Sequence, residues 1–177
     1  MLVLQNTRGL SVHTFGADGC VASTAMLISG GGLNHGLALS PDGKKLYATS
    51  ETTAFSWDYN PDTRQVSNQK TVVRGMSPGI HSSRTVQVVP QDPNFILVQV
   101  GSNSNFDMQS LNKATGRAII KIFDVSRAPS NGWNYNTEGE TYAYGVRNEI
   151  GFVPDPNGVF WGVENSGDVS SSSFCEP

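Results

Sequence analysis

The chain has 177 residues, a formal net charge of −3 and a charged fraction of 15%. That fraction is low for a soluble domain, whereas glycine is abundant with 19 residues, and this balance favours an all-β protein whose surface is made of turns. No cluster of lysine and arginine marks a nucleic-acid surface, and no apolar run reaches the roughly 18 residues that cross a bilayer. We therefore expect one all-β domain that neither binds nucleic acid nor inserts into a membrane.

Short β-rich runs alternate with turn residues along the chain, and helical periodicity is nearly absent. Turns such as Pro41-Asp42-Gly43 separate the runs, because proline fixes φ while aspartate and glycine adopt turn geometry readily. The predicted strands are residues 1–4, 10–15, 25–28, 35–39, 46–49, 53–59, 69–73, 83–88, 96–100, 118–124, 149–152 and 159–164.

Three segments are similar to one another: "HGLALSPDGKKLYATS" (35–50), "RTVQVVPQDPNFILVQVGS" (84–102) and "NEIGFVPDPNGVFWGVENS" (148–166). Each contains an apolar strand, a turn with proline and aspartate, and a second strand, and they recur at intervals of about 50 to 60 residues. This pattern predicts a β-propeller of four-stranded blades. We expect about three of roughly six blades, around residues 1–75, 76–140 and 141–168, followed by an atypical low-complexity tail at 169–177.

An arc of about three blades leaves apolar blade faces uncovered, since propellers close with roughly four to eight blades. We therefore expect a truncated propeller. Two interpretations of the final segment "VSSSSFCEP" stay open: a flexible tail, or the product of an interrupted gene model.

Loops at one end of propeller blades surround a central funnel, so polar residues that precede each repeat are candidates for one shared site. They are Asn34 and His35, then His81 and Arg84, then Arg147 and Asn148. The stretch "GIHSSRTV" (79–86) poses the main question, because His81 fits either a general base or a loop histidine with a satisfied hydrogen bond. The residues alone favour the second interpretation.

The segments "GIHSSRTV", "VGSNSNFD" and "YGVRNEIGFVPDPNGVFWGVENSGD" together resemble the soluble quinoprotein sugar dehydrogenases, whose cofactor is pyrroloquinoline quinone (PQQ). The likeness is strongest to the fungal branch of pyranose dehydrogenases and L-sorbosone dehydrogenases, to which "GGGLNHGLALSPDGKKLYATS" and "ATGRAIIKIFDVS" are also similar. It runs from about residue 8 to residue 168.

The resemblance implies that His81 is the general base, which takes the proton of the anomeric hydroxyl while a hydride passes to the C5 carbonyl of PQQ. It implies that Arg147 and Asn148 bind the cofactor and stabilise negative charge on its oxygens. The alternative for Arg147 is a surface turn in which it pairs with Glu149. Two roles stay open for Arg84: cofactor binding, or bracing of the loop that carries His81.

The resemblance also implies a calcium ion held by main-chain carbonyls just after Glu164, which points to Ser166 and Gly167 as metal ligands. Asn165 is a cofactor contact on the same grounds. Candidate substrate contacts, each of which also fits a structural role at a strand end, are Asn34, His35 and Asn103.

The function implied is PQQ-dependent oxidation of a pyranose or ketoaldose at C1, incomplete or inactive in a truncated chain. Electrons would pass to a one-electron acceptor such as a haem protein, and the family implies an extracellular location, although the sequence shows no signal peptide. Two alternatives stay open. One is a non-catalytic carbohydrate-binding or scaffolding propeller, and the other is a calcium-dependent, lactonase-like hydrolase.

Overall fold

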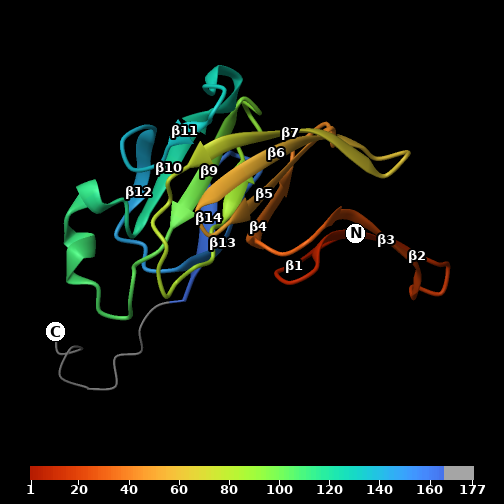
Figure 1. Ribbon diagram of the computed structural model, residues 1–177, viewed down its shortest axis with the longest axis horizontal. Coiled ribbons are helices and arrows are strands. Elements are labelled where there is room, and N and C mark those ends of the chain that lie inside the picture. Colours follow the sequence, from red (N-terminus) through yellow and green to blue (C-terminus); the bar gives the residue numbers. More distant parts are fainter. Residues whose placement is uncertain (166–177) are drawn as a thin grey trace.

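A computed structural model describes residues 1–165, which form fourteen strands and three short 3₁₀ helices without an α-helix (Figure 1). Within this part of the chain, no helix has the length and apolar composition of a membrane span. The predicted all-β class is confirmed. The 3₁₀ helices are η1 (Met108–Leu111), η2 (Lys113–Thr115) and η3 (Val125–Arg127).

The strands form four sheets, in the orders β1-β2-β3, β11-β7-β6-β5-β4, β12-β10-β9-β8 and β13-β14. The first sheet extends away from the others in Figure 1 and contains β1 (Leu2–Gln5), β2 (Gly9–Phe15) and β3 (Val21–Ser29). The second contains β4 (Leu33–Leu39), β5 (Lys45–Ser50), β6 (Thr53–Asn60), β7 (Gln65–Arg74) and β11 (Trp133–Asn134). The third contains β8 (Val86–Val88), β9 (Phe95–Val100), β10 (Ile119–Asp124) and β12 (Glu140–Tyr144). The fourth contains β13 (Glu149–Pro154) and β14 (Phe160–Glu164).

The sheets stack face to face, so that the central ones are buried on both sides. On β9, Val98 packs toward the second sheet, while its neighbour Leu97 packs with Phe152 of the fourth sheet. On β5, Tyr47 faces the third sheet and Leu46 faces the first. Successive strand residues point to opposite faces, so this double burial explains why β5 and β9 read as nearly continuous apolar runs. The arrangement is that of neighbouring blades in a β-propeller.

Every predicted strand has a counterpart in the structure, and the sheets divide the chain differently from the expected blades. The span 1–75 holds two sheets rather than one, and β12 extends the third sheet to residue 144. The sequence analysis missed β11 and β12. β11 has only two residues, and β12 is an edge strand with mostly exposed side chains, so neither shows the apolar alternation that marks a half-buried strand.

The segment between β10 and β12 crosses back to the second sheet. Its strand β11 runs parallel to the end of β7, with Trp133 opposite Val73. Tyr135, the residue that follows β11, is fully buried in the core between the two sheets. Its amide donates to the carbonyl of Arg74 at 2.8 Å. This crossing segment, residues 125–139, therefore ties the two central sheets together.

Candidate functional site

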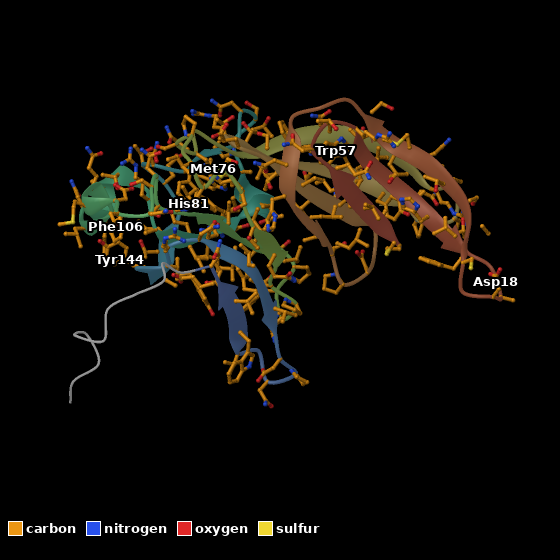
Figure 2. All side chains as sticks on the ribbon, turned by 90° about the horizontal axis from the view of Figure 1, so that it is seen from below. Asp18, Trp57, Met76, His81, Phe106 and Tyr144 are labelled. Atoms are coloured by element: carbon orange, nitrogen blue, oxygen red, sulfur yellow. The ribbon has the colours of Figure 1, made fainter. Side chains whose placement is uncertain are left out.

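His81 lies in the loop from β7 to β8, at the end of the sheets where β4 begins and β9 ends (Figure 2). Its Nδ1 is 2.9 Å from the carbonyl oxygen of Ser102 and 3.0 Å from the Ser102 hydroxyl. A carbonyl oxygen can only accept, and the Ser102 hydroxyl gives its own proton to the carbonyl of Ser104, so Nδ1 carries the proton. The neutral ring then keeps its lone pair on Nε2, the form that can accept a proton.

Arg84 holds the His81 loop from inside. Its side chain is 1% exposed, and its guanidinium donates to three main-chain carbonyls of the loop: His81 at 2.6 Å, Ser83 at 2.7 Å and Ser77 at 2.6 Å. Burial lowers the pKa of this guanidinium, although arginine stays charged in proteins. The donors of its two terminal nitrogens are directed at the loop that carries the histidine.

Groups from three other parts of the chain hold the same loop. The carboxylate of Glu51 accepts the amide of Gly79 at 3.1 Å, and the Asn34 side chain donates to the carbonyl of Ser82 at 2.5 Å. The carbonyl of Asn103 accepts the amide of Ile80 at 3.2 Å. A half-buried histidine whose loop is fixed at so many points has a defined orientation, which general base catalysis requires.

Arg147 and Asn148 lie at the same end, beside the His81 loop. The Arg147 carbonyl accepts the amide of Ser102 at 2.7 Å, and the side-chain amide oxygen of Asn148 accepts the Ser83 hydroxyl at 3.0 Å. The guanidinium of Arg147 donates to the Asn165 carbonyl and to the Asn105 side chain. Ser102 therefore connects His81 directly to the segment that carries Arg147.

The loops approach one another closely at Gly101. A Cβ at this position would lie 2.7 Å from the Arg147 carbonyl oxygen and 3.3 Å from the His81 Cβ, so only glycine fits. A cavity of about 290 Å³ opens beside this junction and is lined by Ser102, Asn105 and Arg147 among others. Glycine at position 101 thus allows the loop after β9, the His81 loop and the segment that carries Arg147 to approach one another beside this cavity.

Two features of this end concern its electrostatics. Burial and, to a smaller extent, the nearby Glu164 raise the pKa of the Glu149 carboxyl. Arg147 Nε and Asn34 Oδ1 are buried without a hydrogen-bond partner among residues 1–165. Buried polar atoms are normally satisfied, so these two are exceptions to that rule.

The structure thus gathers most of the predicted site residues. Arg147, Asn148, Arg84, Asn34 and Asn103 all contact the His81 loop or Ser102, and Asn165 contacts both Arg147 and Asn148. His35 is separate: it is exposed, and its Nε2 is 2.8 Å from the Ile150 carbonyl oxygen. The predicted metal ligands Ser166 and Gly167 lie outside the described residues. Within residues 1–165, no group of three or more His, Cys, Asp or Glu side chains could hold a metal ion.

Sequence reasoning missed Glu51 and gave Ser102 no role. Ser102 follows the strand β9 in the loop "VGSNSNFD", one of the segments that carry the family resemblance, but nothing in the sequence pairs it with His81. Glu51 sits in the turn between β5 and β6, about 28 residues before Gly79, and its contact depends on how the second and third sheets stack. The only feature of the sequence that could have pointed to Ser102 is the run of small polar residues after a buried strand.

A family model described as TrAA12-like matches residues 1–173. The chain belongs to this family. A pyrroloquinoline quinone-dependent pyranose dehydrogenase of Coprinopsis cinerea, 38% identical over 169 residues, is similar to the chain along 95% of its length. The alignment covers 23% of that relative, so the chain spans less than a third of the curated TrAA12 relative.

Two solved structures share the fold of this TrAA12-like chain. The holo form of the pyranose dehydrogenase PQQ domain from Coprinopsis cinerea matches with a TM-score of 0.89 and 38% identity over 93% of this chain and 41% of that one. A calcium structure of a Carbohydrate-Active Enzymes Family AA12 protein from Trichoderma reesei matches with a TM-score of 0.86 and 34% identity, over 94% of this chain and 43% of that one. At these identities the likeness extends to sequence as well as to fold.

Proposed function

We propose that the chain forms part of a PQQ-dependent dehydrogenase that oxidises a pyranose or ketoaldose at C1, with His81 as the general base. The observation that supports the proposal best is the contact between Nδ1 of His81 and the Ser102 carbonyl, because it leaves the lone pair on Nε2. The similar dehydrogenase of Coprinopsis cinerea is named as PQQ-dependent, and its solved PQQ domain is a holo form.

In this proposal the bound quinone supplies a carbonyl that accepts a hydride. His81 removes the proton of the anomeric hydroxyl through Nε2, and the Ser102 carbonyl stabilises the imidazolium that forms by accepting from Nδ1. Asn148 and the main chain of Arg147 are fixed beside the histidine loop, and in the proposal the guanidinium of Arg147 and the side-chain NH₂ of Asn148 stabilise negative charge on cofactor oxygens. The Nε of Arg147, which has no hydrogen-bond partner among residues 1–165, supports this role.

Arg84 enters the proposal as the brace of the His81 loop, because its terminal donors already bind three carbonyls of that loop. Calcium belongs to the proposal through the family and through Ser166 and Gly167. A one-electron acceptor such as a haem protein, and an extracellular location, are further parts of it.

The test is reconstitution of the protein with PQQ and Ca²⁺, followed by reduction of a one-electron dye on addition of pyranoses. His81→Gln is expected to lower kcat by about 10²- to 10⁴-fold, which is the usual contribution of a general base. His13→Gln is the matched control, since His13 lies on the separate first sheet, where its ring bonds to Ser11 and Thr24.

Three outcomes count against the proposal. An unchanged rate in His81→Gln removes the histidine as base. Absence of bound quinone supports the non-catalytic carbohydrate-binding propeller, and hydrolysis of a lactone without any electron acceptor supports the lactonase-like hydrolase.

A further inference from the structure

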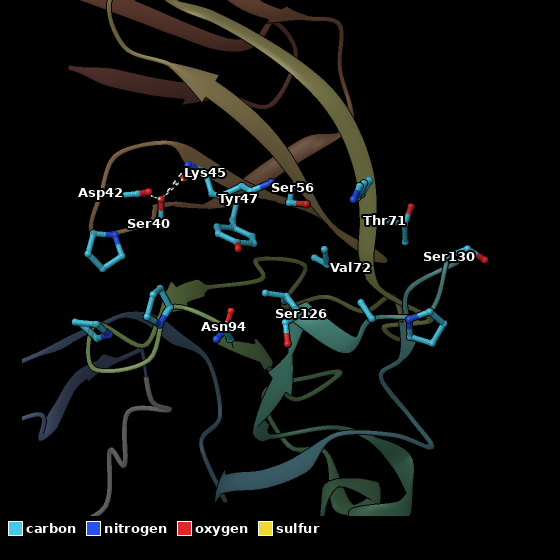
Figure 3. A pocket seen from close by; sticks show the side chains of 17 residues that line it. Ser40, Asp42, Lys45, Tyr47, Ser56, Thr71, Val72, Asn94, Ser126 and Ser130 are labelled. Carbon is cyan, nitrogen blue, oxygen red and sulfur yellow. Dashed lines mark hydrogen bonds between the residues drawn. The ribbon is translucent and has the colours of Figure 1, made fainter.

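A second hollow lies at the opposite end of the central sheets, where β4 turns into β5 and where β9 begins. It is a groove of about 800 Å³ between the second and third sheets, with Tyr47, Ser56 and Val72 on one side and Asn94 and Ser126 on the other (Figure 3), and Val125 and Pro129 also line it. The first wall is formed by strands of the second sheet, and the second wall by loops that flank β9 and β10 of the third sheet, which shares one core with the second. None of the residues of the His81 site lines it.

One wall presents a row of polar side chains from three adjacent strands. Tyr47 on β5 is the direct cross-strand partner of Ser56 on β6, and Ser56 is the partner of Lys70 on β7. Cross-strand partners lie on the same face of a sheet, so the hydroxyls of Tyr47 and Ser56 open into the groove together. Figure 3 shows the Tyr47 hydroxyl directed toward the opposite wall, which carries Asn94.

The two hydroxyls lack partners within the described part of the chain. Tyr47 and Ser56 are only 4% and 7% exposed as whole residues, and their hydroxyls, which make no hydrogen bond to residues 1–165, face the open groove rather than the closed core. By contrast, the hydroxyl of the fully buried Tyr135 donates to the Ile119 carbonyl at 2.8 Å. The Tyr47 hydroxyl instead faces the groove, where it can donate to or accept from a group that enters.

The chemistry of the walls selects the kind of ligand. Val72, Val125 and the prolines provide apolar surface next to hydroxyls and the exposed Asn94 amide, a combination that suits a ring with one apolar face and several hydroxyls. Burial, with a smaller effect of Asp42, raises the pKa of the Tyr47 hydroxyl, so it stays protonated and can both donate and accept.

Charge at the groove is balanced. Lys45 forms an ion pair with Asp58, and Lys70 also lowers the pKa of Asp58 through its charge. Asp58 lies outside the lining and pairs with Lys45, so the remaining charges of the lining are those of Lys70 and Asp42, which have opposite signs. Such a surface would attract an anion only weakly, and it would bind a neutral ligand without an unfavourable electrostatic contribution to the binding free energy.

We propose that this groove is a non-catalytic binding site for a neutral saccharide of a few sugar units. Its volume lies within the range of about 300 to 1,000 Å³ that is usual for ligand sites. The site stands apart from the His81 end, and it requires neither PQQ nor catalysis. A failure of the dehydrogenase proposal would therefore leave it untouched.

The test measures saccharide binding to the protein without PQQ, by calorimetry or ligand-observed NMR, with cellotetraose, xylotetraose and mannotetraose as probes. The double variant Tyr47→Phe/Ser56→Ala is expected to lower the affinity for the best probe by roughly ten- to thirtyfold, since two hydrogen bonds are lost. Tyr142→Phe is the matched control, because Tyr142 is 47% exposed on β12 and outside the groove.

His81→Gln is expected to bind the same saccharide unchanged, which separates the groove from the His81 site. An unaltered affinity in the double variant overturns the proposal, as does the absence of binding by all three saccharides at millimolar concentration. Binding of inorganic phosphate in their place overturns it too. Equal unfolding midpoints of the double variant and the parent protein show that any loss of affinity does not come from unfolding.

Discussion

The two ends of the central sheets differ in how their polar side chains are used. At the His81 end, Arg84 and Ser102 bind their neighbours, and the histidine is held in one tautomer. At the groove end, the hydroxyls of Tyr47 and Ser56 bind none of residues 1–165. The difference teaches that a group which moves a proton needs a fixed orientation, whereas a binding surface needs donors and acceptors that the protein leaves open.

The sharpest way to break this comparison is to remove the brace of the His81 loop. Arg84→Met leaves three main-chain carbonyls without donors in a buried place, and we expect it to reduce the free energy of unfolding by about 3 kcal/mol. Arg127→Met is the control, with a side chain that is 83% exposed, and it should cost less than about 0.5 kcal/mol. Urea unfolding measures both, and equal midpoints would show that Arg84 does not hold the loop.

Two glycines test the same contrast through the backbone. A Cβ at Gly36 would lie 2.2 Å from the Arg84 carbonyl oxygen, so Gly36→Ala should destabilise the protein by about 2 kcal/mol or more. At Gly43, in the turn at the groove end, nothing lies within 4 Å, and only the positive φ of 70° opposes alanine, at about 1 kcal/mol. Thermal unfolding of the two variants compares them, and a reversed order would contradict the close packing at the His81 end.

The two buried tyrosines give a smaller contrast. Tyr135→Phe removes the hydrogen bond to the Ile119 carbonyl, and we expect a loss of about 1 kcal/mol. Tyr47→Phe removes no hydrogen bond within residues 1–165, so its free energy of unfolding should change by less than about 0.5 kcal/mol. A large loss in Tyr47→Phe would mean that its hydroxyl is structural.

The smallest effect depends on pH. The pKa of Glu149 is raised, chiefly by burial, so the folded state holds this proton more tightly than the unfolded state does. The resulting stability is present below the ordinary pKa of 4.5 and is lost as the pH rises through the raised value. Glu149→Gln should therefore show a flatter dependence of the urea midpoint on pH between about 4.5 and 7. A slope equal to that of the parent protein would show that Glu149 does not cause it.

Much of the fold could be predicted because its strands follow local rules. Proline and aspartate turns, together with apolar runs, placed each of the longer strands of the central sheets. The strands β11 and β12 were not predicted, because their pairing depends on long-range contacts rather than on a local sequence pattern. The same limit applies to the site: His81 and Arg147 stand out by position, but the contact between His81 and Ser102 joins loops that come together only when the sheets stack. No sequence pattern predicts that the hydroxyls of Tyr47 and Ser56 face the groove.

The crossing segment at residues 125–139 also bears on how the chain folds. β11 completes the outer edge of the second sheet, yet in the sequence it comes after β8, β9 and β10 of the third sheet. During synthesis, therefore, the sheet of residues 33–74 cannot be completed by β11 until β8, β9 and β10 of the next sheet have been synthesised. The two sheets are expected to fold and unfold as one cooperative unit. Within residues 1–165 the sheet of residues 2–29 gains no strand from a later segment, so only side-chain packing against the second sheet couples its unfolding to theirs.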